Sequence, residues 1–392
     1  MKEKLLLLIF FVCTVVSFAQ EKKITVVLKN EKNQEVIPGA TVSVVHSNQG
    51  AVSNEDGTFR LTLQATSEIV ITHLTFKTIV LSSDNLKLDE NVVFMQENDI
   101  QMEEMIISKI PIYQVLSVLV DNSAKRLSMP IHLNTYCREF IKNQGKYSRF
   151  TDGLVDLHIK GKAKKVDIDA IAIQNRSYGL NEDDPTSEQL IGFNLDKIIE
   201  NTYEFRALKK LCNKKSEKDY DFEIKSNPSD ENIYIINITP KKEVEKLLYN
   251  FKVAYNRTEN LILSVEYKIA DSHIQYSKEM NLLILKFLIK KENFKANFKL
   301  EKDRYFLANT FSDVCFKAWN KRSMNYDLEA SNALVVKGHS DENFSYDKKD
   351  IMNKPVLARN ENNIKSKYWE FDSGLTPTTD EEKIIEKLAA KS

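Results

Sequence analysis

Short runs of alternating apolar and polar residues dominate the first quarter of the chain. In the run at 58–63, Phe59, Leu61 and Leu63 fall on one side of a strand, and the residues between them are polar. Similar β-forming runs, separated by turn-forming residues, are ITVVL at 24–28, TVSVV at 41–45, EIVITHL at 68–74 and NVVFM at 91–95. This spacing of short strands predicts a β-sandwich over residues 21–98.

Longer alternating segments follow after residue 130. The segments FKVAY at 251–255 and NLILSVEYKIA at 260–270 alternate in the same way, and NRTEN between them predicts a hairpin connection. NFKANFKL at 293–300 alternates again, and the chain returns through YFLANTFSDVCFKAW after residues 301–304. The pattern predicts an α+β domain over residues 131–375, built on a large antiparallel sheet with a few helices.

Helical spacing is found in two places. In the linker at 99–130, Ile112, Val115, Leu116 and Leu119 fall on one face of a helix that we expect to pack on the sheet; a partner-binding helix is the alternative. In the polar segment 376–392, the acids at 380–382 suit the N-terminus of a short helix. The expected fold class is therefore mainly β with α+β: an N-terminal β-sandwich followed by a larger antiparallel-sheet domain.

The segment between the strands at 41–45 and 58–63 contains a tight turn. Asn54, Glu55, Asp56 and Gly57 occupy it. Gly57 suits a positive φ, and the Asp56 carboxylate can accept hydrogen bonds from nearby backbone amides. Hairpin geometry explains these residues without any chemistry.

Two stretches of this region carry a family resemblance. Residues 37–42, IPGATV, and residues 50–59, GAVSNEDGTF, resemble the carboxypeptidase regulatory-like domain. The resemblance implies a transthyretin-like (prealbumin-like) β-sandwich, a module common at the N-termini of exported Bacteroidetes envelope proteins. That module accompanies some carboxypeptidases without being the peptidase. Its expected structural turn residues are Pro38, Gly39, Gly50, Asp56, Gly57 and Phe59.

The second domain bears a looser resemblance. YCREF at 136–140 stands where a Bacteroidetes family of envelope proteins has a Tyr-Arg-Glu strand after a helix, and residues 368–388 are similar to that family's ending. The hairpin pattern is also similar in shape to the half-barrel of periplasmic lipoprotein carriers. Shape alone supports this second likeness.

The first 20 residues, MKEKLLLLIFFVCTVVSFAQ, have the features of a secretory signal. Lys2 and Lys4 precede an apolar run at 5–16, and Ser17-Phe18-Ala19 matches the small-x-small cleavage pattern. The run is shorter than the roughly 20 residues of a membrane span, so a retained anchor is the less favoured alternative. We expect residues 1–19 to be removed near Ala19-Gln20, and the mature protein to be periplasmic or peripherally associated with the outer membrane.

Charge and glycine content exclude two classes of partner. The formal net charge is 0, and the loss of Lys2, Glu3 and Lys4 with the signal leaves −1. No basic surface for nucleic acid is therefore expected. With only 10 glycines in 392 residues, the chain is also poor in the residue that phosphate-binding loops require.

Three cysteines follow the signal: Cys137, Cys212 and Cys315. They allow one disulfide with a leftover thiol, or three free thiols. Their wide spacing matches neither a disulfide framework nor a metal site, which favours three free thiols.

No catalytic or metal-binding motif is complete in the sequence. His339 and Glu342 have the spacing of the first two zinc ligands of metallocarboxypeptidases, but no histidine follows to complete the set. Arg138 and Glu139 are neighbours on a predicted strand and point to opposite faces, so we expect a strand-edge role rather than a catalytic pair. The expectation is no catalytic residue, no cofactor and no metal.

Aromatic and basic clusters offer weaker candidates. Phe294, Phe298, Tyr305 and Phe311 could line a lipid or glycan pocket, and Trp319 and Trp369 could stack on a sugar, but ordinary core packing is favoured for each. The lysines at 160–165 and 208–215 are expected to be solvated rather than bound to lipid headgroups.

Three hypotheses of function remain. The favoured one is a non-enzymatic exported envelope protein, in which the β-sandwich is an interaction or spacer module joined to a domain that binds an envelope protein, a lipid or a glycan. The first alternative is a carrier of lipid or lipoprotein in the periplasm. The second is a hydrolase in the second domain whose residues, either dispersed carboxylates or His158 and His273, converge only in three dimensions.

Overall fold

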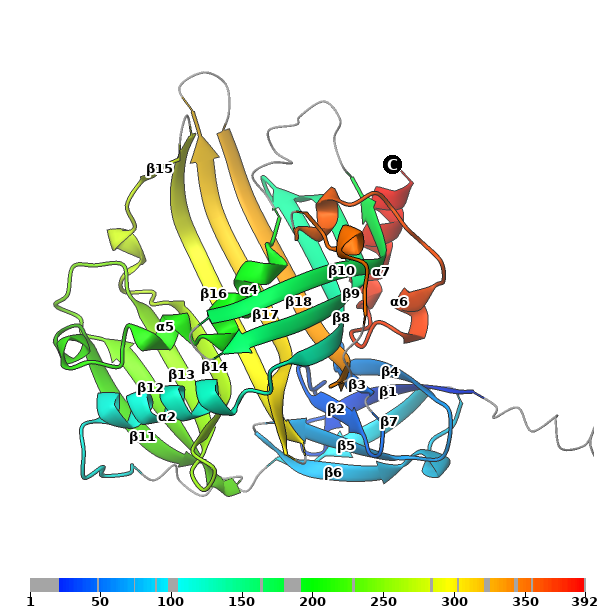
Figure 1. Cartoon of the computed structure of the whole chain (residues 1–392), viewed down its shortest axis with the longest axis horizontal. Coiled ribbons are helices and arrows are strands. Elements are labelled where there is room, and N and C mark those ends of the chain that lie inside the picture. The colour runs from blue at the N-terminus through cyan, green and yellow to red at the C-terminus, as the bar shows by residue number, and fades with distance from the viewer. Residues whose placement is uncertain are drawn as a thin grey trace, which may run out of the picture.

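The computed structural model describes most of the chain after the expected signal. The described residues are 21–47, 49–73, 75–88, 90–97, 105–162, 165–179, 192–227, 230–282, 285–301, 303–320, 325–341, 345–353 and 355–390. The expected signal, its cleavage site and Glu342 lie outside these ranges. The fold class is confirmed: a small β-sandwich is followed by a large antiparallel sheet with few helices (Figure 1).

The β-sandwich forms because its strands alternate. Ile24, Val26 and Leu28 of the first strand are fully buried, and the residues between them are more exposed. One sheet has the order β4-β1-β7, with β1 antiparallel to β4 and parallel to β7, and the other has the order β3-β2-β5-β6. The strands are β1 (Lys22–Asn30), β2 (Thr41–Val44), β3 (Gly50–Val52), β4 (Thr58–Leu63), β5 (Glu68–His73), β6 (Phe76–Ser82) and β7 (Glu90–Met95).

The second domain is an 11-stranded antiparallel sheet, and Figure 1 shows how strongly it curves. Its order is β10-β9-β8-β18-β17-β16-β14-β13-β12-β11, with β15 paired to β16 off this path. The strands are β8 (Ile131–Asn143), β9 (Lys146–Lys162), β10 (Lys165–Tyr178), β11 (Tyr220–Asn227), β12 (Asp230–Pro240), β13 (Tyr249–Asn256), β14 (Leu261–Ile269), β15 (Met280–Leu282), β16 (Leu285–Glu301), β17 (Arg304–Trp319) and β18 (Asn325–Ser340).

Neighbouring strands of this sheet are mostly neighbours in the sequence. The hairpins expected around 256–260 and 301–304 are confirmed as β13–β14 and β16–β17. The exception is β8, which pairs with β9 on one side and with β18 on the other. The strand-edge role expected for Arg138 and Glu139 is therefore wrong, because both lie on β8 in the middle of the sheet.

Three helices cover one face of the sheet, which we call the inner face: α2 (Ile112–Arg126), α4 (Leu195–Tyr203) and α5 (Arg206–Lys209). The helix expected in the 99–130 linker is α2. It buries Leu116, Leu119 and Val120 in the core of the large domain, and Ser123 Oγ accepts a hydrogen bond from Ile262 N of β14 at 2.9 Å. This helix packs on its own sheet, as expected.

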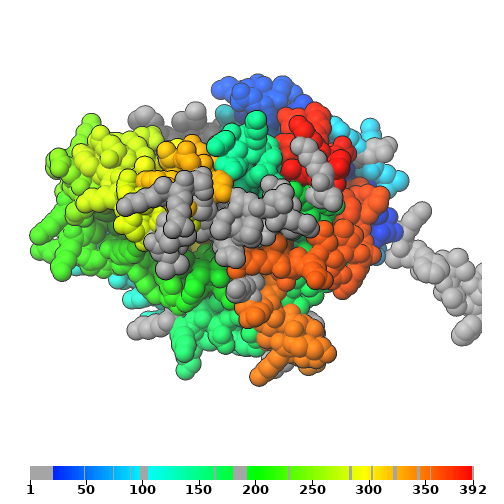
Figure 2. Space-filling view, turned by 90° about the horizontal axis from the view of Figure 1, so that it is seen from above, coloured from blue at the N-terminus to red at the C-terminus, as the bar shows by residue number. Residues whose placement is uncertain are grey.

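The β-sandwich and the C-terminal segment cover the opposite face, which we call the outer face. The C-terminal helices are α6 (Tyr368–Phe371) and α7 (Thr379–Ala389). Val52 of β3 packs in one apolar cluster with Tyr136, Val335 and Tyr368. In Figure 2 the red C-terminal residues accordingly lie beside blue residues of the β-sandwich.

Short 3-10 helices connect several elements: η1 (Ser83–Asn85), η2 (Lys214–Lys218), η3 (Ile274–Tyr276), η4 (Lys348–Asp350) and η5 (Leu357–Arg359). Among the described residues, none of the helices has the length and hydropathy needed to cross a membrane. Cys137, Cys212 and Cys315 are free thiols.

Candidate ligand site at the interdomain junction

The turn at residues 54–57 is built around one asparagine and one glycine. Asn54 Oδ1 accepts hydrogen bonds from Asp56 N at 3.0 Å and Thr58 N at 2.8 Å, so Asn54 takes the local amide-binding role expected of Asp56. Gly57 has a φ of +71°, and a Cβ at this position would lie 2.7 Å from Leu28 O. Both the backbone conformation and the close approach therefore require glycine here.

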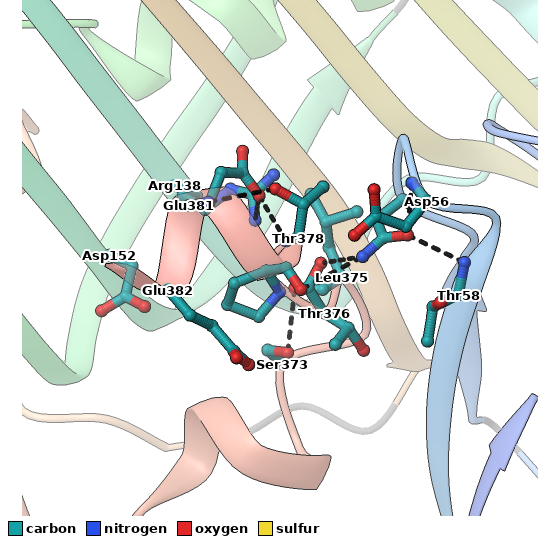
Figure 3. Close-up of polar contacts among 12 residues, drawn as sticks. Asp56, Thr58, Arg138, Asp152, Ser373, Leu375, Thr376, Thr378, Glu381 and Glu382 are labelled. Atoms are coloured by element: carbon teal, nitrogen blue, oxygen red, sulfur yellow. Dashed lines mark hydrogen bonds and ion pairs between the residues drawn. The ribbon is translucent and has the colours of Figure 1, made fainter. Parts of the chain in front are cut away.

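The same turn also holds the C-terminal segment. Asn54 Nδ2 donates to the carbonyls of Thr376 and Pro377, each at 3.1 Å, and the Asp56 carboxylate accepts from Thr379 N at 3.1 Å. Figure 3 shows this turn facing the C-terminal loop. We call this contact region, together with the neighbouring outer face of the sheet, the junction.

Helix α7 begins at the junction and is fixed there by its cap. Thr378 and Glu381 form a capping box, and acids fill the first turn as the sequence predicts. Glu381 Oε2 also lies 3.1 Å from Arg138 Nη1 of β8, and Glu382 lies 3.7 Å from Arg60 Nη1 of β4. The N-terminus of α7 is thus paired with both domains.

A buried carboxylate anchors the segment before α7. Asp152 of β9 is fully buried and accepts hydrogen bonds from Arg176 Nε at 2.8 Å, Tyr136 OH at 2.9 Å and Tyr368 OH at 2.7 Å. The Arg176 guanidinium lies 3.9 Å from the ring centroid of Trp369. The carboxylate of Asp152 on β9 therefore binds side chains from β8, β10 and α6.

Cavities lie along this junction. One of them, which we call the junction cavity, has a volume of about 550 Å³ and lies between the β-sandwich, the outer face of the sheet and the C-terminal segment. A second of about 510 Å³ lies beside Arg138, Glu381 and the turn at 54–57, and a third of about 30 Å³ lies between β2, β3 and the end of β18. All three are lined by residues of both domains.

Charged and polar side chains from separate segments line the junction cavity. They are Arg60 from β4, Asn134 and Asp156 from β8 and β9, Lys337 from β18, and Asp372 after α6. Burial lowers the pKa of Lys337, although the carboxylates of Asp372 and Asp156 oppose that shift. Burial acts against ionisation of Asp156, but hydrogen bonds from His132 and Asn134 hold its pKa below the usual value.

The expected turn residues have different places around this junction. Gly39 has a φ of +73°, and Pro38 and Gly39 line the second cavity. Gly50 lines the junction cavity, and a Cβ there would lie 3.3 Å from Val336 O of β18. Phe59 is fully buried in the sandwich core.

The histidines considered for hydrolysis do not come together. His158 lies on β9, whereas the fully buried His273 follows β14, and β8, β18, β17 and β16 separate these two strands in the sheet. His339, on β18, lies 3.6 Å from the Glu301 carboxylate. His158 instead pairs across strands with His132, a contact that no sequence motif indicates.

The aromatic candidates divide between the two faces of the sheet. Phe298 and Tyr305 are buried in the core of the inner face, and Phe294 packs against it. Phe311 packs instead in the outer-face cluster with Trp369. Core packing thus accounts for Phe298 and Tyr305, whereas Phe294 and Phe311 also line the second cavity. Of the two lysine clusters, Lys160 is paired with Asp169 at 2.9 Å.

The inner face holds a buried acid that titrates near neutrality. Glu139 is 1% exposed, and Asn332 Nδ2 donates to its Oε1 at 3.4 Å. Burial raises its pKa from 4.5 to about 7, despite the opposing charge of Arg149. Because the folded state holds the proton more tightly than the unfolded state, stability declines as the pH rises from about 4.5 to about 7.

Replacing Glu139 with glutamine is therefore expected to stabilise the protein at pH 8 by on the order of 1–2 kcal/mol, with little effect at pH 5. Thermal unfolding at both pH values measures the difference. Glu259→Gln, at an exposed position before β14, is the matched control and should change neither midpoint. Equal shifts at pH 5 and pH 8 would show that the charge of Glu139 is not the cause.

Comparisons with known proteins gave a structural neighbour and a family match for the N-terminal region. Among solved structures, the chain is similar to a LolA superfamily protein from Nitrosomonas europaea, with 10% identity, a TM-score of 0.23, and coverage of 61% of this chain and 97% of that one. A comparison with curated proteins gave no significant match. In the N-terminal region, residues 25–107 match the model of the CarboxypepD_reg-like domain.

Proposed function

We propose that this protein is a non-enzymatic, exported binding protein of the cell envelope. In this proposal, the regulatory-like domain is not an independent spacer. It supplies one wall of a ligand site whose other walls are the outer face of the large sheet and the C-terminal segment. The observation that carries the proposal is the junction cavity of about 550 Å³, lined from all three.

The size of the junction cavity suits a small ligand. Small-molecule sites commonly enclose about 300–1,000 Å³ and carry a few fixed polar groups. Here those groups are fixed: Asn134 Nδ2 donates to Asp156 Oδ1 at 2.8 Å, and the loop containing Gly374 is tied to β3 by the hydrogen bond from Val52 N at 2.8 Å. A preorganised site loses less conformational entropy on binding.

The lining favours a neutral ligand that is rich in hydroxyl groups. Arg60 and Lys337 are balanced by Asp156 and Asp372, so the cavity has no excess of either charge. Hydroxyl groups donate and accept hydrogen bonds and can therefore pair with both kinds of side chain. Phe371 adds an aromatic ring to the wall. A saccharide of the envelope fits this combination best.

The two alternatives have less support. A lipid carrier needs an apolar cavity, but the inner face is filled by α2, α4 and α5, and four charged side chains line the junction cavity. A hydrolase based on His158 and His273 lacks their convergence. The proposal keeps the expected export through residues 1–19, which N-terminal sequencing of the mature protein would test.

An oligosaccharide array probed with the mature chain, followed by calorimetry on any ligand found, tests the proposal. Lys337→Met and Asp372→Asn are each expected to weaken binding at least about tenfold, because each leaves a polar group of the ligand or cavity unpaired. Lys246→Met is the matched control, since Lys246 forms an exposed pair with Asp219 outside the cavity.

Three results would contradict the saccharide site. The first is no saccharide binding by the unsubstituted chain. The second is full affinity in both cavity variants, and the third is an equal loss in Lys246→Met. Lipid that co-purifies with the chain and resists exchange would support the carrier alternative instead.

A further inference from the structure

A group of potential metal ligands lies on the outer face beside the junction cavity. His132 of β8 is directly opposite His158 of β9, and two residues further along the same strands Asn134 is opposite Asp156. Residues two apart on a strand share a face, so these four side chains project from the same side of the sheet. His132 and His158 are buried, and Asp156 is partly exposed.

The distances in this group suit a small cation. One ligand atom from each of His132, Asp156 and His158 lies within 4.8 Å of the others, and His132 Nε2 is 3.4 Å from Asp156 Oδ2. Zinc binds imidazole nitrogen and carboxylate oxygen at about 2.0–2.2 Å, so tetrahedral ligand atoms lie roughly 3.3–3.6 Å apart. The histidine–aspartate distance already falls in that range, whereas the 4.8 Å bound on the whole group is longer, so metal binding requires His158 to move closer.

Neighbouring side chains orient two of the three groups. Ser340 Oγ lies 3.3 Å from His132 Nδ1, which leaves Nε2 as the nitrogen facing Asp156. Asn134 Nδ2 donates to Asp156 Oδ1 at 2.8 Å, which leaves Oδ2 facing His132. Hydrogen bonds of this kind, from groups that do not touch the metal, are a regular feature of histidine and carboxylate sites.

The surroundings of His158 also allow a cation nearby. Its ring stacks on His132 at 4.5 Å between centroids and on Tyr346 at 4.1 Å. The positive charge nearest in sequence, Lys160, is paired with Asp169 at 2.9 Å.

We propose that His132, Asp156 and His158 bind one divalent transition-metal ion, with zinc as the best fit. Two imidazoles and one carboxylate are ligands of the borderline type that zinc prefers to calcium or magnesium. Three protein ligands leave a fourth position for water or an oxygen of a ligand. Asp156 also lines the junction cavity, so the ion lies beside that cavity; the proposal does not depend on the saccharide.

Zinc chloride titrated into tag-free, chelator-stripped mature protein tests the site, with affinity measured by competition against a chromophoric chelator. One ion per chain is expected. Asp156→Asn and His158→Gln are expected to weaken binding more than about tenfold, and Asn134→Ala, which removes only an orienting hydrogen bond, by about tenfold. Cobalt chloride gives a second readout, since the visible bands of bound Co²⁺ report tetrahedral coordination and should be lost in the first two variants.

His46→Gln is the matched control, because His46 is exposed in a turn of the β-sandwich and does not belong to this group of ligands. Circular dichroism without metal confirms that each variant is folded. Asp156→Asn keeps the shape of the side chain, so it removes the metal-binding carboxylate without disturbing the packing. Binding as tight in Asp156→Asn and His158→Gln as in the unsubstituted chain, or an equal loss in His46→Gln, would overturn the proposal, as would absence of zinc binding.

Discussion

Replacing Asp152 with alanine is expected to destabilise the folded chain by about 3–5 kcal/mol, because removing one partner of a buried ion pair leaves the other charge buried without compensation. The Asp152 side chain is fully buried and that of Arg176 is 6% exposed. The substitution also leaves the hydroxyls of Tyr136 and Tyr368 without their acceptor on this side chain.

Urea unfolding followed by tryptophan fluorescence measures this loss, since Trp369 stacks on Arg176. Asp327→Ala is the matched control: this aspartate also pairs with a basic side chain on the sheet, Lys290, but both side chains are 40% exposed or more. An exposed pair of this kind contributes about 0–1 kcal/mol. Comparable losses of unfolding free energy in the two variants would show that burial does not increase the contribution of Asp152 to stability.

Replacing Asn54 with alanine is expected to destabilise the junction by about 2–4 kcal/mol, because one buried side chain loses four hydrogen bonds and leaves their partners unpaired. Two of these bonds hold the turn at 54–57, and two hold Thr376 and Pro377. The substitution should therefore loosen the C-terminal segment as well as the β-sandwich.

Hydrogen exchange of the amides at 373–389 measures the loosening, and limited proteolysis at the C-terminus gives an independent check. Asn33→Ala is the control, because Asn33 lies in a turn of the same β-sandwich but its contacts are exposed and local. It should change stability by no more than about 0.5 kcal/mol. Unchanged exchange at 373–389 in Asn54→Ala would argue against docking by this turn.

The sequence predicted what depends on local pattern. Alternation located the strands of the β-sandwich and the β13–β14 and β16–β17 hairpins, and charged residues after Thr378 located the start of α7. It could not reveal that β8 lies between β9 and β18, because periodicity identifies the buried side of a strand and not its partner. Arg138 and Glu139 were misplaced at an edge for this reason.

The candidate sites depend on contacts between separate segments of the chain, and no short sequence pattern reveals such contacts. Asn54 and Thr376, joined by a hydrogen bond, are 322 residues apart. The His132–His158 pair was within reach, since Gln144 and Gly145 between β8 and β9 form a turn, but its register also depends on an irregularity between Ile141 and Lys142. A one-residue error in register would have placed the two histidines on opposite faces.

Because the turn at 54–57 binds residues 376–379, the junction can form only when the C-terminal segment is present. The β-sandwich has nearby partners for all its strands and can fold as soon as its own residues have been synthesised. Phe371, Asp372 and Gly374, which line the junction cavity, follow all the strands of the large sheet in the sequence. A chain without residues 371–374 therefore lacks one wall of the junction cavity even when its β-sandwich has folded.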